Sequence, residues 1–200
     1  MGCAGSSIAA PRTGDALLVV DVQRDFLPGG SLAVPASDAI LAPLQACIER
    51  FEAMDLPIFV SRDWHPPDHC SFQAQGGNWP EHCVAGGPGA DFPGPLHLPA
   101  GAVIVSKGSS PGRDAYSAFG ETELHQRLQA SRVWRLVVAG LATDYCVLAT
   151  VLDARAMGYE VVVLRDAIAA VELHAGDGVR ALEKMGAAGA SFTDSAALLR

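Results

Sequence analysis

A cysteine stands where an apolar segment gives way to a helical pattern, which is a position that can activate a thiol. Cys146 follows the apolar run at residues 133–139 and falls in the first turn of the pattern at 144–157. The positive end of a helix dipole lowers the pKa of a thiol there, and the N–H groups of that turn can hold an oxyanion. We expect Thr143 or Asp144 to cap the helix. The position favours Cys146 as a nucleophile, although a small buried apolar side chain is the commoner role of a single cysteine.

A base for this thiol must come from another part of the chain, because no histidine lies near Cys146 in the sequence. Asp21 ends an apolar run at 16–21, and Lys107 follows one at 102–106. A carboxylate can accept the thiol proton when burial raises the pKa of the carboxylate, and an ammonium group stabilises both charged forms. Alone, Asp21 would be a turn residue and Lys107 a solvated charge. Beside Cys146 they become candidate catalytic groups.

A second set of side chains suits a divalent metal ion. Asp63 and His65 are two residues apart on an extended segment and so face the same side, and His82 follows after a loop long enough to fold back. One carboxylate and two imidazoles suit Zn²⁺, Fe²⁺ or Mn²⁺ and leave positions for water or substrate. His69 is a further candidate ligand. The pattern therefore predicts an open metal centre.

An alternative grouping of the same loop would make a closed structural zinc site. It joins His69 and Cys70 to His82 and Cys83. Paired ligands in zinc fingers and ribbons are separated by two or more residues, so adjacent pairs disfavour this grouping. We expect the two cysteines to pack instead.

The elements that must position these residues are short apolar strands that alternate with helical patterns. Near-continuous apolar strands are typical of a parallel sheet that is covered on both faces. We predict a doubly wound α/β fold with a mostly parallel six-stranded sheet and helices on both faces. Ligand sites in such folds lie beyond the carboxyl ends of the strands, where the candidate residues stand. The expected strands are 16–21, 58–62, 102–106, 133–139, 160–164 and a short one near 190–192, and the expected helices are 37–54, 144–157 and 174–185.

Composition limits the class of protein. The chain has 200 residues, of which 50% are hydrophobic and 18% charged, and its formal net charge is -8 at pH 7. These values indicate a single domain, which we place at 15–200 after a flexible N-terminal tail at 1–14. The acidic balance argues against a nucleic-acid partner. No apolar run approaches the roughly 20 residues of a membrane-spanning helix.

The cysteines and the N-terminus bear on location. Five cysteines form an odd set without framework spacing, which indicates reduced thiols in the cytoplasm. The first six residues, MGCAGS, fit the pattern for myristoylation at Gly2, with Cys3 available for palmitoylation; this applies only in a eukaryotic host. A disordered leader is the favoured interpretation. The sequence leaves the oligomeric state open, a homo-oligomer included.

Five motifs in order carry a family resemblance that spans about residues 15–192. The chain resembles the nicotinamidase and pyrazinamidase branch of the isochorismatase-like cysteine hydrolases. Arg24 and Tyr145 depart from the residues that many relatives carry at these positions, and neither belongs to the candidate catalytic or metal set. The motifs are DVQRDF at 21–26 with PGGSL at 28–32, RDWHPP at 62–67, WPEHC at 79–83, KG at 107–108 and GLATDYCV at 140–147.

The resemblance implies hydrolysis of nicotinamide to nicotinate and ammonia through a cysteine thioester, in NAD salvage, with related carboxamides as further small-molecule substrates. It also implies a cis peptide bond between Leu141 and Ala142 and one divalent metal ion, zinc before iron or manganese. The implied site consists of Asp21, Lys107 and Cys146 as the catalytic triad; the N–H groups of Ala142 and Cys146 as the oxyanion hole; Asp63, His65 and His82 as metal ligands, joined in some members by a histidine at the position of His69; and Phe26, Trp79, Tyr116 and Leu141 around the pyridine ring.

Two other functions stay open at this point. An isochorismatase-type or N-carbamoyl amide hydrolase would share the triad but lack the metal motif. A non-catalytic metal-binding interaction domain would use the cysteine and the lysine as packing and surface residues. Bound metal would distinguish a nicotinamidase from the first alternative. A reactive Cys146 thiol would distinguish it from the second.

Overall fold

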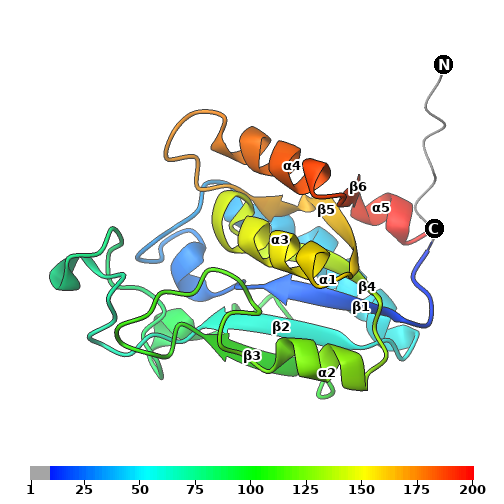
Figure 1. The fold of residues 1–200 in the computed structure, drawn as a ribbon, viewed down its shortest axis with the longest axis horizontal. Coiled ribbons are helices and arrows are strands. Elements are labelled where there is room, and N and C mark those ends of the chain that lie inside the picture. Colours follow the sequence, from blue (N-terminus) through cyan, green and yellow to red (C-terminus); the bar gives the residue numbers. More distant parts are fainter. Residues whose placement is uncertain (1–9) are drawn as a thin grey trace.

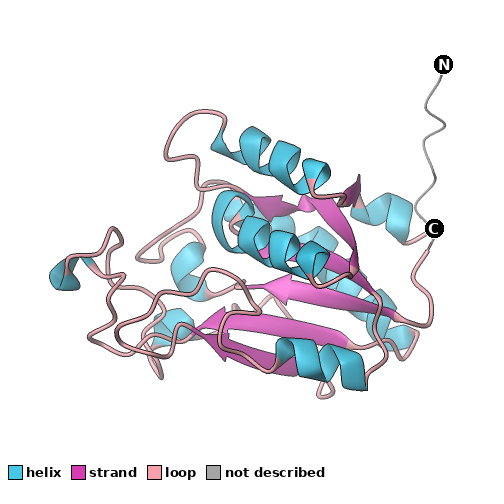
Figure 2. Ribbon diagram, viewed as in Figure 1, coloured by secondary structure: helices cyan, strands magenta, loops and turns pink. Residues whose placement is uncertain are grey.

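A computed structural model describes residues 10–200. Residues 1–9, which contain the acylation pattern and most of the predicted tail, lie outside the described part. Six strands form one sheet in the order β3-β2-β1-β4-β5-β6, and every neighbouring pair is parallel (Figures 1 and 2). The strands are β1 (Asp15–Val20), β2 (Ile58–Asp63), β3 (Val103–Lys107), β4 (Arg135–Leu141), β5 (Glu160–Ala169) and β6 (Ser191–Thr193).

Helices cover both faces of the sheet, which confirms the predicted doubly wound α/β fold (Figure 1). The core on one face includes α1 (Leu41–Ala53) and α5 (Ser195–Leu198). The core on the other includes α2 (Leu124–Ala130), α3 (Leu148–Ala156) and α4 (Asp177–Ala187). Among these described helices, none is long and apolar enough to cross a membrane. The short turns are η1 (Arg24–Phe26), η2 (Ser37–Ile40), η3 (Gln73–Gln75), η4 (Pro88–Ala90) and the π-helical turn η5 (Thr143–Val147).

The central strand β1 shows why these apolar runs form a doubly covered sheet. All six of its residues are buried. Successive side chains of a strand point to opposite faces, so Leu17 and Val19 pack into the core that contains α1, whereas Leu18 and Val20 pack into the core that contains α3. A strand with both faces covered is apolar along most of its length, and the one charged residue of β1, Asp15, is paired with Arg135 of β4. The near-continuous hydrophobicity of the sequence is therefore explained.

Two helices were not expected from the sequence, and the others begin or end a few residues from their predicted bounds. The helix α2 has only seven residues, and just Leu124 and Leu128 of them are buried. The helix α5 has four residues. Such short segments give too few turns for an apolar stripe to stand out. The pattern at 37–54 divides into η2 and α1, and the pattern at 144–157 divides into η5 and α3.

The strand order reverses beside β1, which pairs with β2 on one side and with β4 on the other. In open α/β sheets, ligands bind beyond the carboxyl ends of the strands at such a switch point. Asp21 directly follows β1, and Cys146 lies in η5, five residues after the last residue of β4. The topology therefore places both residues at the expected binding crevice.

Gly140 allows β4 to approach β1 closely just before this crevice. Its φ is +123°, and a Cβ atom there would lie 2.1 Å from the carbonyl oxygen of Val20. We expect Gly140→Ala to lower the free energy of unfolding by more than about 1 kcal/mol, because alanine is strained at this φ and collides with the neighbouring backbone. Urea denaturation measures the change. Gly101→Ala is the control, since a Cβ at Gly101 meets nothing within 4 Å; equal stabilities of the two variants would contradict the prediction.

Candidate active site and metal centre

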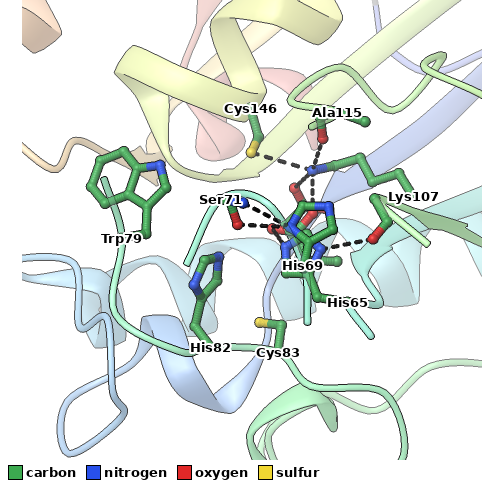
Figure 3. A network of polar contacts seen from close by, with 12 residues as sticks. His65, His69, Ser71, Trp79, His82, Cys83, Lys107, Ala115 and Cys146 are labelled. Carbon is green, nitrogen blue, oxygen red and sulfur yellow. Dashed lines mark hydrogen bonds and ion pairs between the residues drawn. The ribbon is translucent and has the colours of Figure 1, made fainter. Parts of the chain in front are cut away.

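The ends of β1, β3 and the turn after β4 bring the three predicted catalytic side chains together. Lys107 Nζ lies 2.9 Å from Asp21 Oδ2 and 3.4 Å from Cys146 Sγ (Figure 3). A carboxylate oxygen of Asp21 lies within 4.8 Å of the sulfur. Asp21 and Lys107 are fully buried, and Cys146 is 7% exposed. The acid, the amine and the thiol thus form one contiguous cluster.

Lys107 is held as a cation between acidic groups. Its Nζ donates to Asp63 Oδ1 at 2.5 Å and to the carbonyl oxygen of Ala115 at 3.0 Å, besides its ion pair with Asp21. Burial alone would lower the pKa of an amine, but the carboxylates of Asp21 and Asp63 outweigh burial and raise the pKa of Lys107 well above 10.5. The ammonium therefore stays charged in the cluster.

The two carboxylates that contact Lys107 differ in their affinity for a proton. Burial raises the pKa of Asp21 above 3.8, although Lys107 and the Ser61 hydroxyl, which donates to Asp21 Oδ1 at 2.7 Å, act in the opposite direction. Burial also acts on Asp63, but there Lys107 and His65 outweigh it and lower the pKa. Paired groups whose pKa values are pushed apart take separate roles. Asp21 has the character of a proton acceptor, and Asp63 that of a permanent anion.

The expectation that the Cys146 thiol has a lowered pKa is wrong. Burial raises its pKa well above 9.0, and the nearby Lys107 offsets only part of this effect. The helix dipole argument considers the first turn of the helix alone, whereas burial and two neighbouring carboxylates also act on the sulfur. The thiol is therefore neutral in this cluster, and a carboxylate oxygen of Asp21 lies close enough to accept its proton.

The expected helix cap is also wrong. The helical turn starts from Ala142, and neither Thr143 nor Asp144 caps it with a side-chain hydrogen bond. The Asp144 carboxylate accepts instead from the N–H groups of Val171 and Glu172, each at 2.9 Å. Asp144 therefore ties the turn that carries Cys146 to the loop after β5. The Leu141–Ala142 peptide bond is cis, as the resemblance implies.

The predicted metal ligands Asp63, His65 and His82 converge on one point. Their donor atoms lie within 4.8 Å of one another, and all three residues are buried. The Nδ1 atom of His65 lies 2.8 Å from the carbonyl oxygen of Gly108, and that of His82 lies 2.7 Å from the carbonyl oxygen of Pro80. A protonated Nδ1 that donates to a carbonyl leaves Nε2 as the free lone pair, which is the usual arrangement of metal-bound histidines. The donor set fits a divalent ion such as Zn²⁺.

His69 lies beside this set but does not join it. Its ring stacks on His65 with centroids 4.1 Å apart (Figure 3). Its Nδ1 lies 2.7 Å from Ser71 Oγ, and its Nε2 lies 3.1 Å from the carbonyl oxygen of Arg113. Both ring nitrogens are therefore engaged. His69 supports the ring of His65 rather than offering a lone pair.

The closed zinc site of the alternative grouping is not formed. Among the described residues, no group with metal-ligand spacing contains Cys70 or Cys83. Burial raises the pKa of the Cys83 thiol, so this sulfur is a neutral core group. The prediction that both cysteines pack agrees with this arrangement, although Cys70 is only half-buried.

A pocket opens beside the sulfur and the metal ligands, and aromatic side chains form part of its wall. Trp79 Nε1 donates to the Tyr116 hydroxyl at 3.0 Å, and Trp79 meets Tyr145 edge to face at 5.0 Å. Leu141 does not reach the pocket: it is fully buried in the core at the end of β4. The pocket is lined by Phe26, Leu32, Val34, Asp63, His65, Ser71, Trp79, His82, Asp114, Ala115, Tyr116, Ala142, Tyr145, Cys146 and Val171.

Sequence reasoning missed several polar groups that support the cluster. Gln23 and Ser61 are fully buried polar residues beside Asp63 and Asp21. A serine next to the apolar residues of β2 and a glutamine three residues after the end of β1 were the available signals. The carbonyl oxygen of Ala115 gave no signal, because a main-chain acceptor is not encoded by residue type.

A thiol, a carboxylate, an ammonium group and a set of metal ligands around one pocket on a doubly wound parallel sheet are the features of a hydrolase with a candidate cysteine nucleophile. The isochorismatase domain model matches residues 15–197. The chain belongs to the isochorismatase family, which confirms the resemblance drawn from the motifs.

Three similar proteins within this family have names or ligands that bear on its substrate. A nicotinamidase from Escherichia coli is 39% identical over 198 residues, with 88% of this chain and 93% of that protein covered. The pyrazinamidase of Pyrococcus horikoshii, solved in complex with zinc, superposes with a TM-score of 0.87 at 45% identity and covers 90% of this chain and 99% of its own. PnC1 from L. infantum, solved in complex with nicotinate, superposes with a TM-score of 0.87 at 36% identity. The match covers 95% of this chain and 97% of PnC1.

Proposed function

We propose that this chain hydrolyses nicotinamide to nicotinate and ammonia, and that pyrazinamide and related carboxamides are further substrates. The observation that carries the proposal is the meeting of Cys146, Asp21 and Lys107 with a three-ligand metal set at one pocket. Similarity to the E. coli nicotinamidase over most of both chains supports the same activity. Release of ammonia from nicotinamide, measured with and without a chelator, tests it.

The acylation step uses the cluster around the sulfur. Asp21 accepts the proton of Cys146 Sγ, and the sulfur attacks the carboxamide carbon while Lys107 steadies the charged groups. The N–H groups of Ala142 and Cys146, at the start of the helical turn, hold the tetrahedral oxyanion. Asp21 then gives the proton to the leaving nitrogen as the C–N bond breaks. The products are a nicotinoyl thioester and ammonia.

The deacylation step reuses the same base. Asp21 accepts a proton from a water molecule, and the water oxygen attacks the thioester carbon. The same two N–H groups hold the second oxyanion. The C–S bond breaks, the sulfur recovers its proton, and nicotinate leaves. Lys107 keeps its proton, because Asp63 and whichever of Asp21 and Cys146 is ionised raise its pKa.

The proposed metal site consists of Asp63, His65 and His82, with zinc as the first candidate and iron or manganese as alternatives. The zinc complex of the P. horikoshii pyrazinamidase supports this order. A bound divalent ion supplies a Lewis acid beside the pocket. The protein contributes two imidazoles, whose Nδ1 atoms are held by the carbonyl groups of Gly108 and Pro80, and the ionised carboxylate of Asp63.

The pyridine ring is proposed to lie between Phe26 and Trp79, with Tyr116 nearby. All three residues line the pocket that contains Cys146. Tyr145 belongs to the same wall, since it contacts Trp79 and lies 5.7 Å from Tyr116 between ring centroids. Flat apolar walls suit an aromatic substrate because stacked or edge-to-face rings add to the burial of apolar surface.

The assembled metal set bears on the two alternatives. An isochorismatase-type or N-carbamoyl amide hydrolase would need the triad alone, yet Asp63, His65 and His82 also converge here. A non-catalytic interaction domain gives no reason for a buried lysine to lie 3.4 Å from a buried thiol. We therefore favour the metal-containing amide hydrolase over both.

We expect Asp63→Ala or His82→Ala to lose the bound metal and to lower kcat/KM for nicotinamide at least about 10-fold, because each change removes one of three protein ligands. Elemental analysis of the purified variants measures metal content, and ammonia release measures turnover. His97→Ala is the control, since His97 is exposed and lies outside the metal set. Normal metal content in both ligand variants would disprove the site.

The cellular location, the metabolic role and the partners are proposed from the sequence and from the free thiols. Cys47, Cys70, Cys83 and Cys146 are all free, which suits a reducing cytoplasm. The reaction fits NAD salvage, because nicotinate is a precursor that such salvage reuses. The net charge of -8 suits a small-molecule enzyme without a nucleic-acid partner. The oligomeric state stays open, a homo-oligomer included, and so does acylation at Gly2, for which a disordered leader is the favoured alternative.

A further inference from the structure

The buried side chain of Gln23 has no part in the steps above, yet it makes three hydrogen bonds. Gln23 is fully buried. Its Oε1 accepts the N–H of Asp63 at 2.8 Å, and its Nε2 donates to the carbonyl oxygens of Asp63 at 2.8 Å and Ala90 at 3.0 Å. All three hydrogen bonds of the side-chain amide therefore go to main-chain groups.

These contacts replace a missing piece of the sheet. The register of β1 with β2 ends at Val19 opposite Val60, and the chain leaves the sheet at Asp21, whose φ is +48°. Asp63 still pairs with Lys107 of β3 on the other side. The main-chain N–H and carbonyl groups of Asp63 face the side where β1 no longer runs beside β2. The side-chain amide of Gln23 lies there and bonds to both groups. Both main-chain groups of Asp63 are therefore fixed by one side chain.

The fixed main chain of Asp63 sets the direction of its carboxylate. One oxygen contacts Lys107 Nζ at 2.5 Å, and the other lies 3.7 Å from His65 Nε2. Asp63 thus belongs to both the catalytic cluster and the metal set. A small rotation of its backbone would move the carboxylate away from the point where the three ligands converge. The third hydrogen bond of Gln23 adds η4 to the same support through Ala90.

We propose that Gln23 is a positioning residue that aims the Asp63 carboxylate at the metal and at Lys107. The proposal rests on the function proposed above. Groups that orient a metal ligand from behind change metal affinity or activity by about 10–100-fold when they are removed. A residue that only fills space in the core would alter stability and leave the metal affinity of the folded protein unchanged.

The test compares the zinc affinity of Gln23→Met, Gln23→Glu and the parent chain, each shown to be folded by circular dichroism at the assay temperature. Zn²⁺ competition with a chromophoric chelator gives the dissociation constant. Methionine has a similar length but no hydrogen-bonding group, whereas a neutral glutamic acid can still accept from Asp63 N–H and donate to one carbonyl. Gln126→Met, at an exposed position of α2, is the control.

We expect Gln23→Met to bind zinc about 10–100-fold more weakly, Gln23→Glu to fall between it and the parent, and the control to match the parent. We also expect Gln23→Met to lower kcat/KM for nicotinamide. A folded Gln23→Met with zinc affinity within about twofold of the parent would overturn the inference. If Gln23→Met does not fold, a folded Gln23→Glu that binds zinc as tightly as the parent would overturn the inference instead.

The parent chain separates this inference from the proposed function. If the parent binds one zinc ion and releases ammonia from nicotinamide while Gln23→Met matches it in both, only the role of Gln23 fails. If the parent binds no zinc, the metal site and the role of Gln23 fail together. If the parent binds zinc but does not hydrolyse nicotinamide, the substrate is wrong and the zinc comparison still decides the role of Gln23.

Discussion

Replacement of Cys146 by alanine is expected to lower kcat for nicotinamide by at least about 10⁴-fold, because no other described group can form the thioester. The sulfur lies beside Lys107 and Asp21 and lines the pocket, whereas the other described thiols do not line it. Ammonia release, followed over hours at high enzyme concentration, measures the residual rate.

The fold of Cys146→Ala should be retained. Loss of one sulfur atom leaves a small cavity, and we expect the free energy of unfolding to change by no more than about 1–2 kcal/mol. Cys70→Ala is the matched control, since Cys70 is half-buried and lies outside the catalytic cluster. Retained turnover in Cys146→Ala would remove the thioester mechanism, and loss of turnover in the control would point to a general effect of thiol removal.

Asp21→Asn is expected to lower kcat by about 10²–10⁴-fold, because the amide cannot accept the proton of the thiol or of water. The change suits the local backbone: the φ of Asp21 is +48°, a region that asparagine adopts more readily than most residues. The Ser61 hydroxyl can still donate to the side-chain oxygen. Near-parental thermal stability together with loss of turnover would therefore locate the effect in proton transfer.

The same base predicts a pH dependence. Burial raises the pKa of Asp21 above 3.8, and the base works only when it is ionised. The value of kcat/KM should therefore fall as the pH drops through an apparent pKa higher than that of an ordinary aspartate, about 3.9. A profile that stays flat down to pH 4, or Asp21→Asn with parental kcat, would show that another group accepts the proton.

The sequence by itself determined the fold class and the candidate catalytic and metal residues. Apolar runs of strand length, separated by helical patterns, require a doubly covered parallel sheet, because only such a sheet buries both faces of each strand. Parallel strands end at the same edge, so the polar residues at their ends, such as Asp21, Asp63 and Lys107, must meet there. This inference needs only the order and polarity of residues.

The tertiary structure alone decided how each group behaves at that edge. The raised pKa of Cys146 depends on its burial and on the carboxylates of Asp21, directly after β1, and Asp63, at the end of β2. The exclusion of His69 from the metal set depends on Ser71 and on the carbonyl group of Arg113, 44 residues away. The packing of Leu141 in the core likewise involves contacts between distant segments. The same is true of the hydrogen bonds between the Gln23 side chain and the main chain of Asp63. Periodicity along a chain encodes which face of an element is buried, but hydrogen bonds, proton affinities and ligand geometry arise from distances between segments that only folding sets.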